Sequence, residues 1–216
     1  MVCFNAMCIE ESIEEVRFKI HGILKSAEVF LLCPMAFVES EIECAILEAI
    51  SINVTGRMKC IAQEGESMQP VKITVSKDFQ LSGHLECCGA VKMDVDEMFV
   101  QKRSEAGSIK VQQHLEIITA ENGSVLLEGL TVGRKDAITS LNIDAKNIKV
   151  SGNISDISRL ELSVDKEIKL TEESRISSCE SIDIRGEWIT IAGNIDEFLT
   201  LEIEPWALLN LSLIHI

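Results

Sequence analysis

The segment IKVSGNI at residues 148–154 is followed by the nearly identical ITIAGNI at residues 189–195. The same apolar pattern recurs around both segments, in units that begin at Leu141, Leu160, Ile182 and Leu201. Each unit has an alternating apolar pair, a second pair further along, and one closing apolar residue. A unit of about 20 residues cannot bury its own apolar edge, so such units must stack on one another.

The pattern extends upstream, with unit starts at Val29, Ile50, Val71 and Val91. Alternation of apolar and polar residues indicates short strands with one buried face. Three such strands in each repeating unit predict an all-β fold, a single-stranded parallel β-solenoid (β-helix) with rungs of about 19–22 residues. The two similar segments then lie two turns apart. An antiparallel sandwich is the alternative, although it requires no fixed period.

The alignment of the units predicts which residues stack in the core. Ile143, Leu162 and Ile184 should form one inward column, and Ile148, Ile168 and Ile189 should form another. Gly152 and Gly193 fall at a corner of the coil, where a residue without a Cβ atom bends freely. The segment SGHL at residues 82–85 matches the same corner, and Cys60 occupies a core position equivalent to Leu81.

One internal stretch, residues 120–140, exceeds the repeat. A unit start at Ile109 is followed by the next clear start only at Leu141, an interval well beyond the regular spacing. We therefore predict a protruding hairpin or loop with turns at Asn122-Gly123 and at residues 133–136. Insertions in solenoids often carry the binding face, so the candidate partner-binding residues are Leu126, Leu127, Leu130, Arg134 and Lys135.

The two ends of the sequence also depart from the repeat, which limits the predicted solenoid to residues 27–204. In residues 1–26, Ile9, Ile13, Val16 and Ile20 follow helical spacing, but Val16 and Ile20 also alternate with Phe18, which leaves a helix and a partial rung both open. The final residues LSLIHI match one translation of the transposase end sequence used in sequencing libraries. Residues 205–216 are therefore expected to be a non-native or truncated tail.

Composition excludes several classes of function. A net charge of −15 repels phosphate backbones, so nucleic acid is not an expected partner. The eight Cys contain no C-x-x-C pair and the four His have no ligand spacing, so we expect no metal or other cofactor, and the thiols should be buried. The longest apolar run, residues 29–38, is about half a membrane span, and no membrane insertion is predicted.

Few residues suggest chemistry. Asp94 and Asp96 lie about 7 Å apart if both are on one strand, a spacing at which paired carboxylates can cleave glycosidic bonds. No aromatic platform for sugars stands beside them, and we predict that the chain is not an enzyme. Trp188 precedes the inward Ile189 in the position that Asn147 and Glu167 hold in neighbouring units. It should be partly exposed and is a further candidate for partner binding.

The phrase LELSVDKEIKLTEESRISSCESIDIRGEWITIAGNIDEFLTLEI, residues 160–203, resembles the haemagglutinin-type repeats of bacterial filamentous haemagglutinin-like exoproteins. The resemblance implies a right-handed β-helical shaft of a surface or secreted adhesin, and the truncated tail implies that the chain is a fragment of a longer protein. It also implies an extracellular or cell-surface location and a host-cell, glycan or protein partner. The chain departs from this family by its eight Cys, its many Glu and Lys, and its few Asn and Gly at corners.

Two other functions are compatible with a β-solenoid. The first is a cytoplasmic, self-assembling scaffold similar to bactofilins that stacks end to end, and the Cys content favours it. Self-association through exposed solenoid ends is also expected of a shaft that is cut from a longer chain. The second is a polysaccharide-active β-helix enzyme, which the absence of an aromatic platform disfavours.

Overall fold

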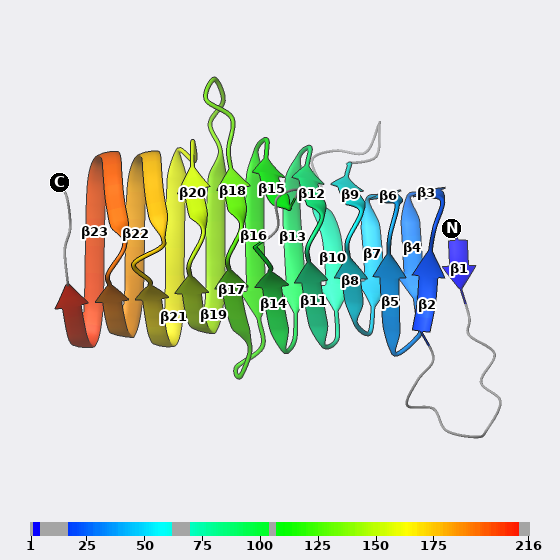
Figure 1. The fold of residues 1–216 in the computed structure, drawn as a ribbon, viewed down its shortest axis with the longest axis horizontal. Helices are drawn as coiled ribbons and strands as arrows, with labels where there is room; N and C mark the ends of the chain where they lie inside the picture. The colour runs from blue at the N-terminus through cyan, green and yellow to red at the C-terminus, as the bar shows by residue number, and fades with distance from the viewer. Residues whose placement is uncertain (1, 5–16, 62–69, 104–106, 212–216) are drawn as a thin grey trace.

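The chain forms a single parallel β-solenoid of about nine turns, as a computed structural model shows (Figure 1). The structure describes residues 2–4, 17–61, 70–103 and 107–211. Within these ranges the regular elements are strands, without a helix. Every strand pair that joins one turn to the next is parallel, which confirms the fold class predicted from the repeat and excludes the antiparallel sandwich.

Each turn has three faces, which we call A, B and C in chain order. Face A comprises β1 (Val2–Phe4), β4 (Glu28–Leu31), β7 (Ile46–Ala49), β10 (Val71–Val75), β13 (Ala90–Val95) and β16 (His114–Thr119). Face B comprises β2 (Arg17–Ile20), β5 (Met35–Val38), β8 (Ile52–Val54), β11 (Asp78–Leu81), β14 (Met98–Gln101) and β17 (Ser124–Leu127). Face C comprises β3 (Ile23–Lys25), β6 (Glu41–Cys44), β9 (Arg57–Cys60), β12 (His84–Cys87), β15 (Ser108–Val111), β18 (Leu130–Val132) and β20 (Asn153–Ser155).

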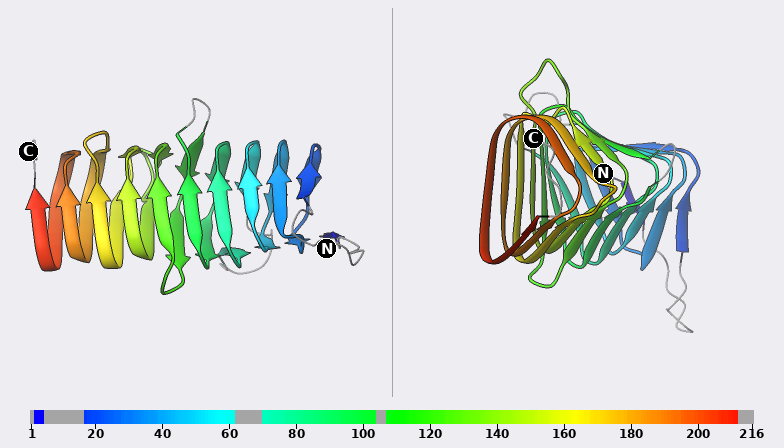
Figure 2. Two further views of the ribbon diagram at one scale, coloured as in Figure 1. Left: turned by 60° about the horizontal axis from the view of Figure 1, so that its bottom comes forward. Right: turned by 60° about the vertical axis from the view of Figure 1, so that its left-hand side comes forward.

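Longer strands bend round the corners in the last turns. β19 (Ser140–Val150) and β21 (Arg159–Leu170) cover faces A and B without a break, while β22 (Arg175–Ile191) and β23 (Asn194–Leu211) start on face C and continue through A and B. Seen more nearly end-on, the turns superpose around one interior (Figure 2).

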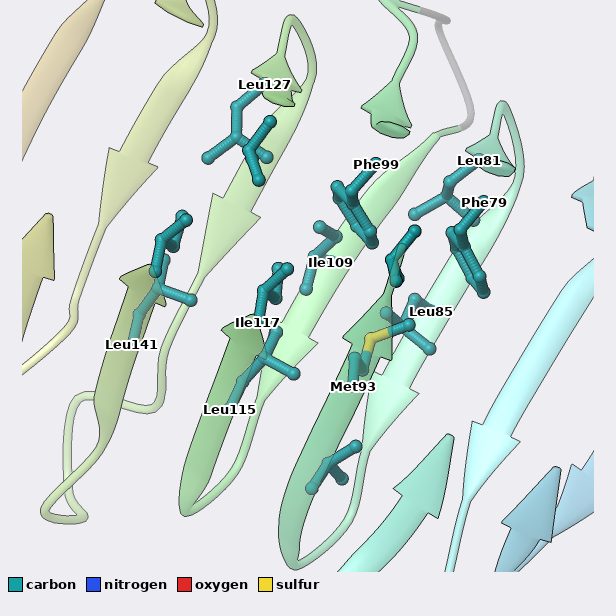
Figure 3. Close-up of a cluster of buried hydrophobic side chains, with 14 of the residues drawn as sticks. Phe79, Leu81, Leu85, Met93, Phe99, Ile109, Leu115, Ile117, Leu127 and Leu141 are labelled. Carbon is teal, nitrogen blue, oxygen red and sulfur yellow. The ribbon is translucent and has the colours of Figure 1, made fainter. Parts of the chain in front are cut away.

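The predicted inward columns are confirmed. Ile143 pairs with Leu162 and Leu162 with Ile184 on face A. On face B, Ile148 pairs with Ile168 and Ile168 with Ile189. All six side chains are buried, and the columns continue along the axis through residues such as Met93, Ile117 and Phe99 (Figure 3). Because full burial of one such side chain contributes about 1.5–3 kcal/mol, these columns hold the turns together.

The corner glycines allow close packing between turns. A Cβ atom on Gly152 would lie 2.0 Å from the carbonyl oxygen of Gly129, one turn earlier. A Cβ atom on Gly83 would lie 1.9 Å from the carbonyl oxygen of Gly56. The predicted corner is therefore confirmed, but its glycines are required by backbone contact with the turn below and not by freedom to bend.

Two predicted unit starts are wrong. Leu47 on β7 continues the face A column from Val29 to Ile73, whereas Ile50 lies between faces A and B. The start at Leu47 was missed because the second residue of its alternating pair is the small Ala49. Ile109 pairs with Leu85 on face C and so ends a turn, and Leu115 on face A starts the next one.

Turns of unequal length share the same face A column. If the length of a turn is counted between paired residues on face A, the shortest turn runs from Val29 to Leu47. The turn from Ile117 to Ile143 is longer than either turn beside it, which run from Met93 to Ile117 and from Ile143 to Leu162. The inward residues of each face stay paired, and the register shifts fall between faces A and B, so the extra length lies at the corners.

The solenoid extends beyond both predicted boundaries. At the N-terminal end, β2 pairs with β5 and β3 with β6, so residues 17–25 belong to the coil, while Ile9, Ile13 and Val16 lie outside the described residues. At the other end, residues 205–211, assigned from sequence to the tail, continue β23 and pair with β22.

A polar pair interrupts the apolar core beside the turn that starts at β16. Gln101 and Thr131 are both buried at inward positions, on β14 and β18. The Thr131 hydroxyl donates a hydrogen bond to Gln101 Oε1 at 3.3 Å, and Gln101 Nε2 donates to the Leu130 carbonyl oxygen at 2.9 Å. Buried polar groups need such partners, so the two residues depend on each other.

The outer surface of face C carries charges of alternating sign. In consecutive turns, Lys25 pairs with Glu43, Glu43 with Lys59, Lys59 with Glu86, and Glu86 with Lys110. Lys25 Nζ and Glu43 Oε2 form an ion pair at 3.0 Å. Opposite charges on adjacent strands stabilise their pairing, whereas like charges oppose it. We call this column of five residues the charge ladder.

Candidate binding surfaces

The loop at residues 133–139 joins β18 to β19 and is the tallest projection at the upper edge of Figure 1. Its base is fixed by hydrogen bonds to the next turn. The Gly133 amide donates to the Ser155 carbonyl oxygen at 2.9 Å, and the Thr139 hydroxyl donates to the Asp156 carbonyl oxygen at 3.1 Å. Thr139 is fully buried and also exchanges backbone–hydroxyl bonds with Ser158. The loop is therefore displayed on a firm base.

The tip of this loop combines apolar and charged residues. Ile138 is 89% exposed, and Arg134, Lys135 and Asp136 are exposed beside it. Lys135 Nζ lies 3.9 Å from Asp156 Oδ1 at the base. An isoleucine this exposed forfeits its burial energy unless a partner covers it, so the tip is the best candidate contact surface in this turn.

The structure alters the site predicted from residues 120–140. Most of that stretch is not an excursion, because β17 and β18 pair with the turns on both sides. Leu127 is buried in the core, as Figure 3 also shows, so its predicted availability to a partner is wrong. Leu126 is half-buried, Leu130 is 42% exposed, and Arg134 and Lys135 are exposed as expected. Ile138 was missed because a single apolar residue in a loop has no periodicity.

An elongated groove follows the corner between faces B and C. One cavity in this groove is about 560 Å³ and is lined by residues that include Arg103, Glu128, Lys149, Lys169 and Glu173. Arg103 reaches along the axis to Glu173, with Nη1 and Oε2 at 2.9 Å. The lining has three cationic and three acidic side chains, so the groove offers no single charge to a ligand.

The adjoining cavity, about 320 Å³, contains His84 and Ser108. His84 Nδ1 and Ser108 Oγ lie 3.1 Å apart. A nucleophile and base in contact still require a group that orients the base, and in the described part of the chain no carboxylate forms a hydrogen bond or ion pair with the His84 ring. We assign this pair to the packing of adjacent turns.

The predicted carboxylate pair is not arranged as one strand would place it. Asp94 lies on β13, whereas Asp96 lies in the bend that follows that strand. Asp94 Oδ1 is 3.8 Å from Lys92 Nζ, and its neighbours in the adjacent turns are Thr74 and Ile118. Asp96 has therefore left the strand on which the predicted spacing of the two carboxylates depends.

Three thiols stack in consecutive turns on face C. Cys44 pairs with Cys60 and Cys60 with Cys87, all three are buried, and none is in a disulfide. Burial raises the pKa of the Cys44 thiol, and a hydrogen bond to Cys87 together with burial raises the pKa of Cys60. Cys60 is a core residue as predicted, but on face C and not in the Leu81 column of face B. We call these three residues the thiol column.

Trp188 occupies the predicted outward position on face B. It pairs with Glu167 in the turn before and is 47% exposed. No group of three or more His, Cys, Asp or Glu in the described ranges could hold a metal ion. Over the same residues there is no helix with the length and apolar character needed to span a membrane.

Comparison of the chain with protein-family models, with curated proteins and with solved structures finds no match. The fold therefore rests on the structure alone, and the likeness to haemagglutinin-type repeats extends only to the β-solenoid architecture.

Proposed function

We propose that the chain is a structural and binding segment of a bacterial adhesin-like β-helical protein at the cell surface or in the medium. The solenoid would serve as a stiff shaft, because each turn is joined to the next on three faces and the inward columns run along its length. The main support for a binding role is Ile138, which is almost fully exposed on a loop whose base is fixed by hydrogen bonds. A partner would contact Ile138, Arg134, Lys135 and the neighbouring Leu130.

The thiol content is compatible with export. Cys44, Cys60, Cys87 and Cys179 are buried, and burial raises the pKa of Cys179 to about 11. The thiolate is the form that reacts with oxidants and disulfides. Buried thiols held in the protonated form react slowly, so reduced cysteines can persist in the core of an exported protein.

The binding role is tested with the labelled full chain on cultured epithelial cells and on a glycan array. Replacing Ile138 by Asp and reversing the charges of Arg134 and Lys135 should abolish saturable binding, because these changes remove the apolar contact and the basic tip. The matched control is Glu121→Lys, which alters the exposed loop at residues 120–123 of the same turn. Equal binding by the parent and the triple variant, or no saturable binding by the parent to either probe, would count against the proposal.

A cytoplasmic, self-assembling scaffold is the second candidate, and the thiol column favours it. Side chains that face each other in adjacent parallel strands are separated by about 4.8 Å, close to the spacing that a disulfide spans. Unlinked thiols at this spacing suit a reducing compartment. β23 also presents Leu199, Trp206 and Leu208 to solvent, and such a strand can recruit a second chain.

Sedimentation of the reduced chain over a range of concentrations separates the two candidates. A scaffold should form progressively longer assemblies, and a Leu199→Glu variant should remain monomeric. If the chain is a monomer at all concentrations, the scaffold function is excluded and the shaft function remains.

A further inference from the structure

A second exposed apolar surface lies on the outside of the last two turns. Trp188 on β22 is in register with Leu208 on β23, and these side chains are 47% and 59% exposed. Trp206, two residues before Leu208, is 62% exposed. Inward neighbours such as Ile189 are buried, so Trp188 faces solvent and does not fill the core. We call these three residues the Trp188 patch.

Two acidic side chains without a cationic partner border the Trp188 patch. Glu167 is exposed and pairs directly with Trp188 from the preceding turn, and Asp165 is exposed two residues before Glu167. Among the described residues, neither carboxylate forms an ion pair. These two groups therefore leave negative charge at the edge of the patch for a partner to neutralise.

Two cations at the rim, Lys166 and Arg185, are already paired. Lys166 Nζ is held by Glu187 Oε2 at 3.0 Å, and Arg185 Nε lies 3.4 Å from Glu204 Oε2 on β23. Lys169 lies two residues beyond Glu167 on β21 and is exposed. These rim residues carry a net negative charge, because they comprise four acids and three cations. Once the two ion pairs are set aside, the remaining charges are Asp165, Glu167 and Lys169, all on β21.

We propose that the Trp188 patch is a docking surface for a cationic, partly apolar segment of a partner protein. A guanidinium or ammonium group stacks favourably on an indole face. The aliphatic stem of Arg or Lys would cover Trp188, while its charge meets Glu167. An anionic segment would be repelled by the same rim, and an uncharged one would leave Glu167 and Asp165 without partners. This surface is independent of the loop at residues 133–139, which has a basic tip and lies on an earlier turn (Figure 1).

The sequence supplies its own reporter for this surface. The chain has two Trp and no Tyr, and both Trp residues belong to the patch. Intrinsic fluorescence excited in the indole band therefore reports on this site alone. The probe is a short unlabelled peptide of alternating Arg and Leu separated by Gly, and the matched control peptide has Glu in place of Arg.

The Arg peptide should produce a saturable change in tryptophan emission that weakens as salt is added, because the rim charges are exposed. Trp206→Phe retains Trp188 as reporter and should keep the change. Glu167→Lys should weaken binding at least about threefold, the loss expected for one exposed cation contact. Glu121→Lys, an equal charge change on another turn, and Ile138→Asp should leave the titration unaltered.

Three outcomes would overturn the proposal. The first is an emission that does not respond to the Arg peptide. The second is an equal response to the Glu peptide, which would show an apolar surface without charge preference. The third is an emission that changes on dilution of the protein alone, which would show that a second copy of the chain covers the patch.

Discussion

Two neighbouring turns, residues 114–132 and 140–155, have the same inward pattern and different corners. Their core residues pair one to one, as Leu115 with Leu141, Ile117 with Ile143, Val125 with Ile148, Leu127 with Val150, and Thr131 with Ile154. Between faces A and B the first turn has the loop 120–123, whereas β19 runs on without a break. Between faces C and A the first has residues 133–139, and the second has only 156–158.

The comparison shows which parts of the coil can vary. A face is constrained on both sides by the turns it pairs with, because a change of register would expose a whole column. A corner contacts its neighbours only at its base, so it can lengthen while the columns stay in place. Extra length in this fold is therefore added at corners, and the turn at residues 114–139 is where the described chain adds most.

The largest effect is expected from a substitution that breaks the inward pattern shared by both turns. Ile148→Asp would bury a carboxylate between the turns above and below, since Ile148 is 1% exposed. We expect a loss of about 4 kcal/mol or more in the free energy of unfolding, or failure to fold. Lys149→Ala, one residue along and outward, should stay within about 0.5 kcal/mol. Chemical denaturation followed by circular dichroism measures both, and similar stabilities for the two variants would contradict the inward assignment.

A smaller effect concerns Thr131, an inward residue that is polar where the next turn has Ile154, and its partner Gln101 on the preceding turn. Gln101→Leu would remove the partner of the Thr131 hydroxyl and of the Leu130 carbonyl oxygen. Leaving buried polar groups unpaired should cost about 1–3 kcal/mol. Adding Thr131→Val, which makes this turn apolar like the one at residues 140–155, should recover part of that loss. A double-mutant cycle by denaturant unfolding measures the coupling, and strictly additive losses would show that the pair does not act as a unit.

The smallest effect concerns face A, where Ile118 of one turn pairs with Asp144 of the next. Burial raises the pKa of Asp144, and repulsion from Asp165, Glu116 and Glu161 adds to the effect. Ionisation of Asp144 therefore costs more in the folded chain than in the unfolded chain. Its contribution to stability falls as the pH rises from its ordinary pKa through the raised value.

Asp144→Asn should accordingly give a slightly higher melting temperature at about pH 7 and no gain at about pH 3, where the carboxyl is protonated in both states. Thermal unfolding of the parent and the variant in parallel provides the measurement. A gain that is larger in acid would reverse the sign of the inferred shift.

The sequence predicted the columns well because alternation specifies which side chains point inward, and Ile168 or Ile184 could be placed without coordinates. It could not specify on which of three faces an inward pair lies. Cys60 was therefore placed in the core but on the wrong face, and Ile109 was taken for the start of a turn that it ends.

Corners were the other source of error. The segment at residues 124–132 has the alternation of a strand, yet the long interval around it suggested an excursion, and Leu127 was placed outside the core. Only the length of each corner distinguishes these two arrangements, and corner residues carry no periodic signal. Ile138 and Gln101 were missed for a related reason, because each is a single departure from the composition of its surroundings. Of the Trp188 patch, only Trp188 was identified from the sequence, since Leu208 was assigned to the tail.

The charge ladder restricts how such a chain can grow by duplication. Its signs repeat every second turn, from Lys25 to Lys59 to Lys110. Duplicating one of these turns would set lysine beside lysine or glutamate beside glutamate, whereas duplicating two would preserve every opposite pair. Selection on this face would therefore retain insertions of even numbers of turns, and a lineage that lengthens here should do so in steps of two.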